Sequence, residues 1–217
     1  KTNLTLVLNR YRTIRIAVMG EAYRPGNYQV PGVASLFNVL YLTGGPTEKG
    51  SLRNIQIIRA GKKLTELDFY QFLLHGAMQE NFRLQDQDVI YFPFYNKHVS
   101  MSGAIKRPAV YELKDNESLK DLFAIAGGFA PNAYQQRVKI YQVGAVQRSI
   151  KDLPVADMPT YLPQNGDSVL VDALNDAYSN KLNINGAIRV AGDYELTQGL
   201  TLKGLLEKAG GLRENAY

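Results

Sequence analysis

Two neighbouring aspartates are the first residues of this chain whose type and spacing could support chemistry. Asp86 and Asp88 are two residues apart, and a pair of carboxylates can act as general acid and general base. A later segment of similar pattern carries Asn165 and Asp167 instead. Because the pair does not recur, we interpret these residues as turn residues that accept hydrogen bonds from nearby backbone. The sequence therefore predicts that the protein is not an enzyme.

The composition argues against metal and cofactor sites. The 217 residues include no Cys and only two His, His75 and His98, neither beside an evident acid or nucleophile. Disulfides, thiol catalysis and sites built from Cys or several His are excluded. The net charge of +5 is too small for a dedicated nucleic-acid-binding protein. We expect no cofactor, no metal and no nucleic-acid partner.

Arginine and tyrosine side chains are the better candidates for contacts with a ligand or a neighbouring subunit. Arg24 and Arg107 each precede a proline in an expected turn, where a guanidinium could bind an acidic sugar or another subunit. An ordinary surface arginine is the alternative. Tyr91 and Tyr95 lie in a dense aromatic segment that could pack between domains or form a contact face. These four residues are the candidate contact residues.

A fixed offset organises the chain. Gly20, Gly103 and Gly186 are each 83 residues apart. The same offset relates four further positions: Tyr28, Tyr111 and Tyr194; Leu36, Leu119 and Leu202; Gly44, Gly127 and Gly210; and Gly45, Gly128 and Gly211. A period of this length corresponds to one small domain per copy.

We therefore expect three repeats. The chain is divided into a strand or linker from a preceding region, a first repeat, a second repeat and a truncated third repeat, at 1–13, 14–95, 96–178 and 179–217. The expected fragment lacks the closing strands of its third repeat, and the parent protein would extend beyond both ends. No apolar run reaches the roughly 18 residues of a membrane-spanning helix.

Each repeat follows the same predicted order of elements. A strand with alternating apolar residues leads through a turn into a short returning strand. A helix follows, and Leu119, Leu122, Phe123 and Ala126 form its apolar stripe in the second repeat, with Ser118 as the helix cap. Further strands close the repeat, which predicts an α+β fold with a helix across a small mixed sheet. We assign structural roles to the glycines that end the first strand, Gly20, Gly103 and Gly186, and to those that end the helix, Gly45, Gly128 and Gly211.

The repeated pattern resembles the SLBB domain, a soluble-ligand-binding β-grasp module. The resemblance rests on residues 18–28 (VMGEAYRPGNY), the Gly-Gly-Pro at 44–46 and the closing segment 84–91. It covers nearly the whole chain and implies tandem β-grasp-like domains, two complete and one truncated. Such tandem domains are similar to those of outer-membrane polysaccharide export proteins of Gram-negative bacteria, which form stacked periplasmic rings and are usually lipid-anchored.

This resemblance implies a function and a location. We expect the periplasmic portion of a capsule or exopolysaccharide export protein, associated with the outer membrane, that acts by oligomeric assembly and weak glycan contact. The expected partners are further copies of the full-length chain, the polysaccharide and the inner-membrane export machinery. Membrane contact would come only through regions outside these residues. The alternative is a monomeric module that binds a soluble ligand or glycan without a conduit role.

Overall fold

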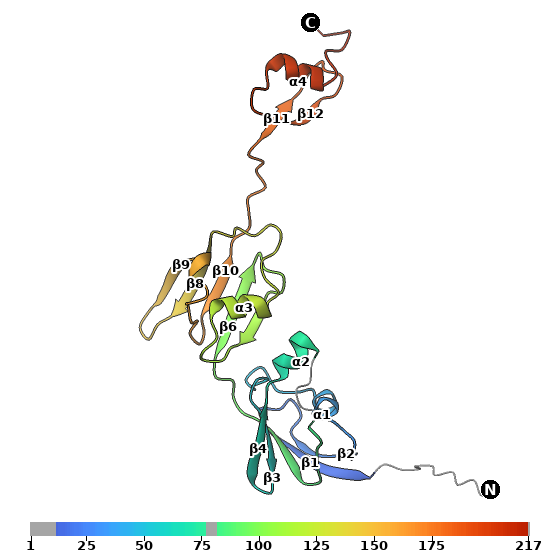
Figure 1. Ribbon diagram of the computed structural model, residues 1–217, viewed down its shortest axis with the longest axis vertical. Helices are drawn as coiled ribbons and strands as arrows, with labels where there is room; N and C mark the ends of the chain where they lie inside the picture. The colour runs from blue at the N-terminus through green and yellow to red at the C-terminus, as the bar shows by residue number, and fades with distance from the viewer. Residues whose placement is uncertain (1–11, 77–81, 217) are drawn as a thin grey trace, which may run out of the picture. The chain divides into compact units, whose positions relative to one another are not determined.

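Seven elements build the first repeat. The computed structural model describes residues 12–76 and 82–216, so most of the segment expected as a preceding strand or linker, 1–11, lies outside the described residues. Thr13 is the first residue of the first strand. The elements of the first repeat (Figure 1) are β1 (Thr13–Gly20), β2 (Gly26–Pro31), α1 (Leu36–Thr43), β3 (Ile55–Arg59), β4 (Lys62–Leu67), α2 (Phe69–His75) and β5 (Asp88–Phe92).

The second repeat has the same topology. Its elements are β6 (His98–Gly103), β7 (Ala109–Glu112), α3 (Leu119–Ile125), β8 (Arg137–Val143), β9 (Arg148–Pro154), the short 3₁₀ helix η1 (Val155–Asp157) and β10 (Ser168–Val171). The strand order is β2-β1-β5-β3-β4 in the first sheet and β7-β6-β10-β8-β9 in the second. In both sheets the opening and closing strands are parallel, and all other neighbours are antiparallel. Two mixed sheets of one topology confirm the predicted tandem α+β fold.

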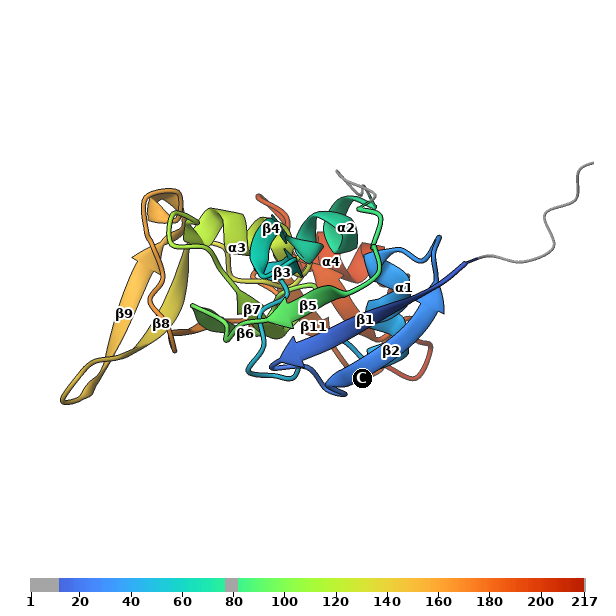
Figure 2. The ribbon, with the colours of Figure 1, turned by 90° about the horizontal axis from the view of Figure 1, so that it is seen from below.

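One helix covers one face of each sheet because both elements are amphipathic. Ile14, Ile16 and Val18 alternate along β1 and are buried against Val39 and Leu40 of α1. Figure 2 shows β2 beside β1, with α1 against this sheet. The predicted stripe of the second repeat is also buried, since Leu119, Leu122, Phe123 and Ala126 are at most 4% exposed.

Local signals begin and end the helices. Ser118 accepts a hydrogen bond from the backbone N–H of Asp121, and the Asp121 carboxylate accepts one from the Ser118 N–H. This reciprocal capping box satisfies two donors that the first turn leaves free. After the helix, Gly127 and Gly128 have φ of 83° and 86°, which is left-handed backbone that glycine adopts without strain.

Close approach between strands explains the glycine at the end of each opening strand. Gly20 and Gly103 have φ of +81° and +84°. A Cβ at Gly20 would lie 2.2 Å from the carbonyl oxygen of Phe92, and one at Gly103 would lie 2.0 Å from that of Val171. Any side chain there would push the closing strand away. Gly186 of the third repeat has φ +115° and no atom within 4 Å of such a Cβ.

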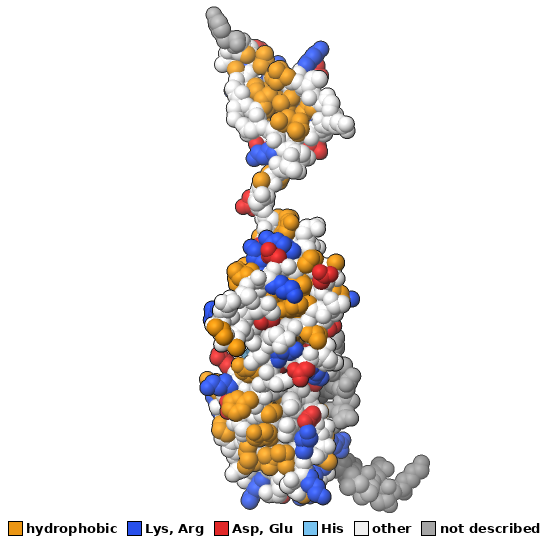
Figure 3. Space-filling view, turned by 90° about the vertical axis from the view of Figure 1, so that its left-hand side faces the viewer, with side chains coloured by type: hydrophobic (Ala, Val, Ile, Leu, Met, Phe, Trp, Pro, Cys, Tyr) orange, Lys and Arg blue, Asp and Glu red, His pale blue; other side chains and the backbone are white. Residues whose placement is uncertain are grey.

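Residues 174–217 form a compact unit of their own, separate from the unit that contains the first two repeats. This unit contains the hairpin β11 (Lys181–Ile184) and β12 (Gly192–Glu195), followed by α4 (Leu202–Lys208). Leu205 and Ala209 of its helical stripe are buried, whereas Leu202 is 72% exposed. Figure 3 shows hydrophobic side chains gathered on the surface of this unit. The part of the chain that the structure describes contains no helix long and apolar enough to cross a membrane.

Equivalent leucines test how far the helical stripe is buried. Leu119 is fully buried, and Leu202, at the same place in the third repeat, is largely exposed. Leu119→Ala should lower the free energy of unfolding by about 2–5 kcal/mol because it leaves a cavity. Leu202→Ala should change it by less than about 0.5 kcal/mol. Urea unfolding followed at NMR signals of each repeat measures both values, and equal losses would contradict the structure.

Candidate functional site

The neighbouring acids of the closing segments take structural positions. Asp86 Oδ1 accepts a hydrogen bond from the backbone N–H of Arg15 at 2.8 Å. In the second repeat, Asn165 Oδ1 accepts one from the N–H of His98 at 2.9 Å. An amide and a carboxylate thus accept the same kind of backbone hydrogen bond, which requires an acceptor oxygen and no acid. This explains why the pair of acids does not recur.

The second acid of each segment folds its own turn, as its sequence position predicted. Asp88 Oδ2 accepts from the N–H of Gln85 at 2.7 Å, and Asp167 Oδ2 accepts from that of Gln164 at 2.9 Å. Both aspartates are buried. Asp88 also forms a bidentate ion pair with Arg59, at 2.7 and 2.8 Å. These contacts give Asp88 and Asp167 structural roles rather than the roles of a general acid and a general base.

The buried acid of the second repeat has a different partner. The residue 83 positions after Arg59 is Gln142, which donates to the hydroxyl of Tyr161 at 3.0 Å. That hydroxyl lies 3.4 Å from Asp167 Oδ2, while Asp167 Oδ1 has no hydrogen-bond partner among the described residues. Burial and the Asp167 carboxylate raise the pKa of Tyr161 to about 12. Tyr161 is therefore a neutral hydrogen-bond donor at pH 7.

The two candidate arginines differ in their surroundings. Arg107 donates from Nη2 to the carbonyl oxygen of Ile125 at 2.7 Å, at the C-terminal end of α3. Arg24 is exposed, and its guanidinium makes no hydrogen bond or ion pair within the described residues. The recurring tyrosines hold the turns, since the hydroxyls of Tyr28, Tyr111 and Tyr194 donate to the carbonyl oxygens of Arg24, Arg107 and Val190 at 2.8, 2.6 and 2.7 Å.

The candidate tyrosines lie at the end of the first repeat: Tyr91 is in the closing strand β5, beside the end of β1, and Tyr95 follows that strand. Tyr91 is half-buried, and its ring lies 2.8 Å from the place where a Cβ on Gly20 would be. Tyr95 stacks on the imidazole of His98, with ring centroids 3.5 Å apart and planes at 10°. Because His98 begins the second repeat, Tyr95 contacts the junction between the first two repeats. The side chain of the other histidine, His75, lies outside the described residues.

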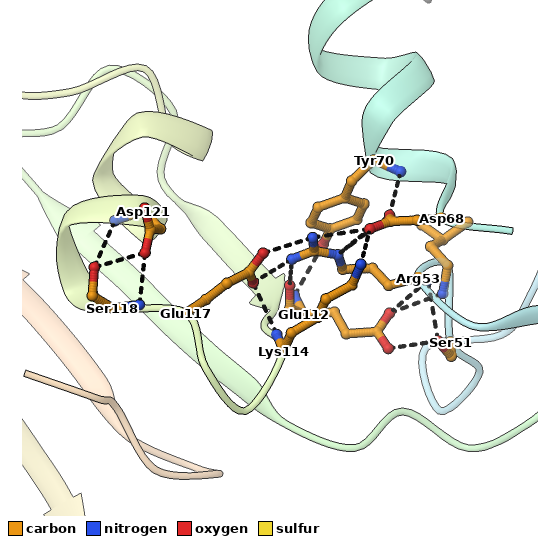
Figure 4. Close-up of polar contacts among 10 residues, drawn as sticks. Ser51, Arg53, Asp68, Tyr70, Glu112, Lys114, Glu117, Ser118 and Asp121 are labelled. Atoms are coloured by element: carbon orange, nitrogen blue, oxygen red, sulfur yellow. Dashed lines mark hydrogen bonds and ion pairs between the residues drawn. The ribbon is translucent and has the colours of Figure 1, made fainter. Parts of the chain in front are cut away.

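A buried arginine at this junction gathers charged residues from both repeats (Figure 4). The Arg53 side chain is 5% exposed and lies 3.0 Å from Asp68 and 2.5 Å from Glu117. Its Nη1 also donates to the carbonyl oxygen of Glu112 at 3.2 Å, and its guanidinium lies 4.8 Å from the centre of the Tyr70 ring. Arg53, Asp68 and Tyr70 belong to the first repeat, and the two glutamates belong to the second. We call this set, with Ser51 and Lys114, the Arg53 cluster.

Glu112 fastens the second repeat to the loop before β3. Its carboxylate accepts hydrogen bonds from the Ser51 hydroxyl at 2.5 Å and from the Leu52 N–H at 2.9 Å. In return, the Glu112 N–H donates to the Tyr70 hydroxyl at 3.0 Å. Tyr70 also packs against the hydrophobic core of the second repeat. Polar and apolar contacts thus unite the first two repeats in one compact unit.

The charges in the cluster stabilise one another. Burial opposes ionisation of Asp68, but hydrogen bonds from Arg53 and Lys114 outweigh it and hold the Asp68 pKa below its ordinary value. Burial likewise disfavours the charged form of Arg53, and the bonds to Glu117 and Asp68 reverse this effect and raise the Arg53 pKa. Both shifts favour the charged forms, so Asp68 and Arg53 form an ion pair at pH 7. Separating either of them from its partners would leave a poorly solvated charge.

A groove of about 570 Å³ opens beside the cluster. The first repeat contributes the outer face of α1, the loop after it and the start of α2; the second repeat contributes three side chains. The residues that line it include Phe37, Tyr41, Gly44, Gly45, Pro46, Thr47, Glu48, Phe69, Tyr70, His98, Val110 and Glu112. A concave, largely apolar surface with a few polar groups is typical of a binding site. The described residues contain no cluster of His, Cys, Asp or Glu that could hold a metal ion.

The sequence analysis did not identify the Arg53 cluster. Arg53 and Glu117 are 64 residues apart, and the residue 83 positions after Arg53 is Gln136. The comparison of equivalent positions in the repeats therefore did not indicate that Arg53 and Glu117 interact.

Comparison with known proteins relates the chain to one domain family and to one transport protein. Residues 15–68, 98–151 and 181–217 each match the SLBB domain. Two sequences named polysialic acid transport protein KpsD, from Escherichia coli, are each 24% identical to this chain over 207 residues. The match covers 95% of this chain and 37% of each relative. Both findings point to a transport or binding protein rather than an enzyme.

Removal of Arg53 should weaken the joint between the repeats. Arg53→Ala removes the buried cation that lies between the half-buried carboxylates of Asp68 and Glu117, and leaves only Lys114 beside Asp68. Removal of one partner from a buried ion pair costs about 3–5 kcal/mol. Arg137→Ala is the matched control, because its pair with Asp152 is exposed and should contribute about 0–1 kcal/mol. Urea unfolding monitored separately in each repeat should show coincident transitions for the wild type and separate ones for Arg53→Ala. Coincident transitions in that variant would contradict the coupling.

The joint should also weaken in acid. The Asp68 pKa is lowered in the folded state, so its contribution is present above the ordinary aspartate pKa of about 4 and is lost as the pH falls through the folded value. Asp68→Asn keeps a side chain able to cap α2 and removes the charge. The difference in unfolding free energy between wild type and variant should shrink below about pH 4. A difference that does not vary with pH would show that the charge of Asp68 is unimportant.

Proposed function

The chain belongs to the SLBB domain family, and we propose that it forms the periplasmic portion of an outer-membrane polysaccharide export protein. The observation that carries this proposal is the similarity to KpsD along 95% of the chain. The chain spans about a third of the length of that relative. The polymer, the assembly and the partners of the whole protein are therefore parts of the proposal.

The geometry supports a role in assembly rather than in bond chemistry. Asp86, Asp88 and Asp167, which we predicted to be turn residues rather than catalytic acids, accept hydrogen bonds from the backbone of turns and strands. The Arg53 cluster joins two domains in one unit, and a domain pair of fixed geometry suits a subunit that must repeat regularly around a ring. A closed ring requires a head-to-tail interface, in which two different surfaces of each subunit meet.

Arg24 is the first candidate for that interface. It is exposed at a turn, and its guanidinium makes no hydrogen bond or ion pair within the described residues. Arg107 is also exposed but holds the end of α3, and Tyr91 and Tyr95 have partners inside the chain. We propose that Arg24 contacts an acidic group of the neighbouring subunit, with Arg107, Tyr91 and Tyr95 as secondary candidates.

The proposed setting follows from the same relationship. The full-length protein would be a homo-oligomer in the periplasm of a Gram-negative bacterium, associated with the outer membrane through regions outside these residues. The polysaccharide and the inner-membrane export machinery would be its partners. The groove beside the Arg53 cluster favours a second possibility, in which a monomer binds a soluble ligand or glycan and forms no conduit.

Export and oligomer mass test the proposal together. Deletion of the gene should remove most of the surface polysaccharide, and wild-type protein should restore it. Full-length Arg24→Glu should form fewer oligomers in detergent and restore export poorly, because it reverses the charge at the proposed contact. Arg148→Glu, at an exposed arginine of β9, is the matched control and should behave as wild type. Normal export in the deletion strain with monomeric full-length protein would favour the ligand-binding alternative.

A further inference from the structure

Three exposed aromatic residues of the first repeat are not explained by the repeated fold. Tyr23, Phe37 and Tyr41 are 69%, 39% and 86% exposed. At the same positions, the second repeat has Lys106, Lys120 and Ala124, and the third has Arg189, Lys203 and Glu207. The fold therefore accepts charged or small residues at these places. Exposed aromatic groups found in one copy alone call for a role outside folding.

Two of these aromatic residues line the groove, and the third lies beside a glycine that lines it. Phe37 and Tyr41 line it from α1, and Tyr23 is adjacent to Gly44, whose Cβ would lie 3.5 Å from the Tyr23 side chain. Phe37 is held in place by Phe69 and Phe72, with ring centroids 6.2 and 5.1 Å away. An anchored ring loses little conformational entropy on binding. The first repeat thus offers preformed aromatic surfaces to a ligand.

The second repeat also contributes to the lining of the groove. His98 and Val110 line it there, and Val110 is 60% exposed. His98 is held by its stacking on Tyr95, and the Arg53 cluster fixes the repeat that carries it. The second repeat has a hollow of similar size at the equivalent place, but Lys120 and Ala124 stand there instead of the two aromatic residues. The aromatic groove is thus specific to the first junction.

The charges of the groove indicate what kind of ligand it suits. Its lining contains two carboxylates, Glu48 and Glu112, and no lysine or arginine among the described residues. Burial lowers the pKa of His98, so its imidazole is neutral at pH 7 and can donate one hydrogen bond and accept another. A polyanion would find no cation in this lining, and the exposed carboxylate of Glu48 would repel it.

We propose that this groove binds a short stretch of uncharged glycan, with sugar rings stacked on Tyr41 and Phe37. Sugar rings present C–H groups that suit the negative face of an aromatic ring, and their hydroxyls match the His98 imidazole and the Glu48 carboxylate. This inference rests on the proposed role in polysaccharide export and names a class of saccharide that the chain contacts. Uncharged segments of a polymer or of its precursor are ligands of this class.

The second repeat supplies matched variants for a direct test. Tyr41→Ala and Phe37→Lys introduce the residues that α3 carries at the same positions, so the fold should persist, and NMR spectra check that it does. The probes are maltohexaose and chitohexaose, which are uncharged, and a hexamer of sialic acid, which is anionic. Tyr178→Ala removes another exposed tyrosine, outside the groove lining, and is the control.

We expect both uncharged oligosaccharides, or one of them, to shift the NMR signals of groove residues at millimolar concentration. Each groove variant should weaken this binding about tenfold, and Tyr178→Ala should not. The inference is overturned if neither uncharged oligosaccharide binds, or if the sialic acid hexamer binds more tightly in the groove. It is also overturned if the wild-type chain self-associates and the Tyr41→Ala variant does not, because this surface would then be a subunit contact.

The export assay separates this inference from the proposed function. Loss of export on gene deletion, with no oligosaccharide binding, would leave the export role intact and overturn the groove. Binding that depends on Tyr41, in a protein whose deletion leaves export unchanged, would support the groove and contradict the export role.

Discussion

Burial of the Arg53 guanidinium is the constraint on which the joint between the first two repeats depends. A cation removed from water must be matched by nearby anions and hydrogen-bond acceptors, or the state that buries it is unstable. Asp68 of the first repeat and Glu117 of the second supply the opposite charges, at 3.0 and 2.5 Å. Because neither repeat alone completes this set, the cation is satisfied only when the two domains adopt one relative arrangement. The groove, which has walls from both repeats, depends on the same arrangement.

Within each repeat, close contacts of the backbone fix how the strands and the helix are arranged. The opening strand can run beside the closing strand because Gly20 and Gly103 have no side chain. A tyrosine hydroxyl then holds the turn that follows, and paired glycines end the helix. These devices recur at a fixed offset because they satisfy the backbone of any copy. The exposed surface is under no such restriction, and there the repeats diverge in charge and in aromatic content.

This division explains how much could be predicted from the sequence. The helical stripe of α3, its Ser118 cap and the turn role of Asp88 depend on local spacing, and the structure confirms them. The Arg53 cluster depends on which side of one domain faces the next, and neither hydrophobic periodicity nor the 83-residue offset carries that information. The groove was missed for the same reason, although Phe37 and Tyr41 stand where the other repeats have Lys, Ala or Glu. Comparison of the repeats with one another, position by position, would have revealed these two residues but not their partners.

The rotational motion of the first two repeats shows whether Arg53 joins them into one body. Relaxation of backbone ¹⁵N nuclei gives a correlation time for residues 13–92 and another for residues 98–171, the two sheets and their helices. The wild-type chain should give one common value for both ranges, and Arg53→Ala should give two shorter and different values. Different correlation times in the wild type, or a common value that persists in Arg53→Ala, would show that Arg53 does not join the repeats into one body.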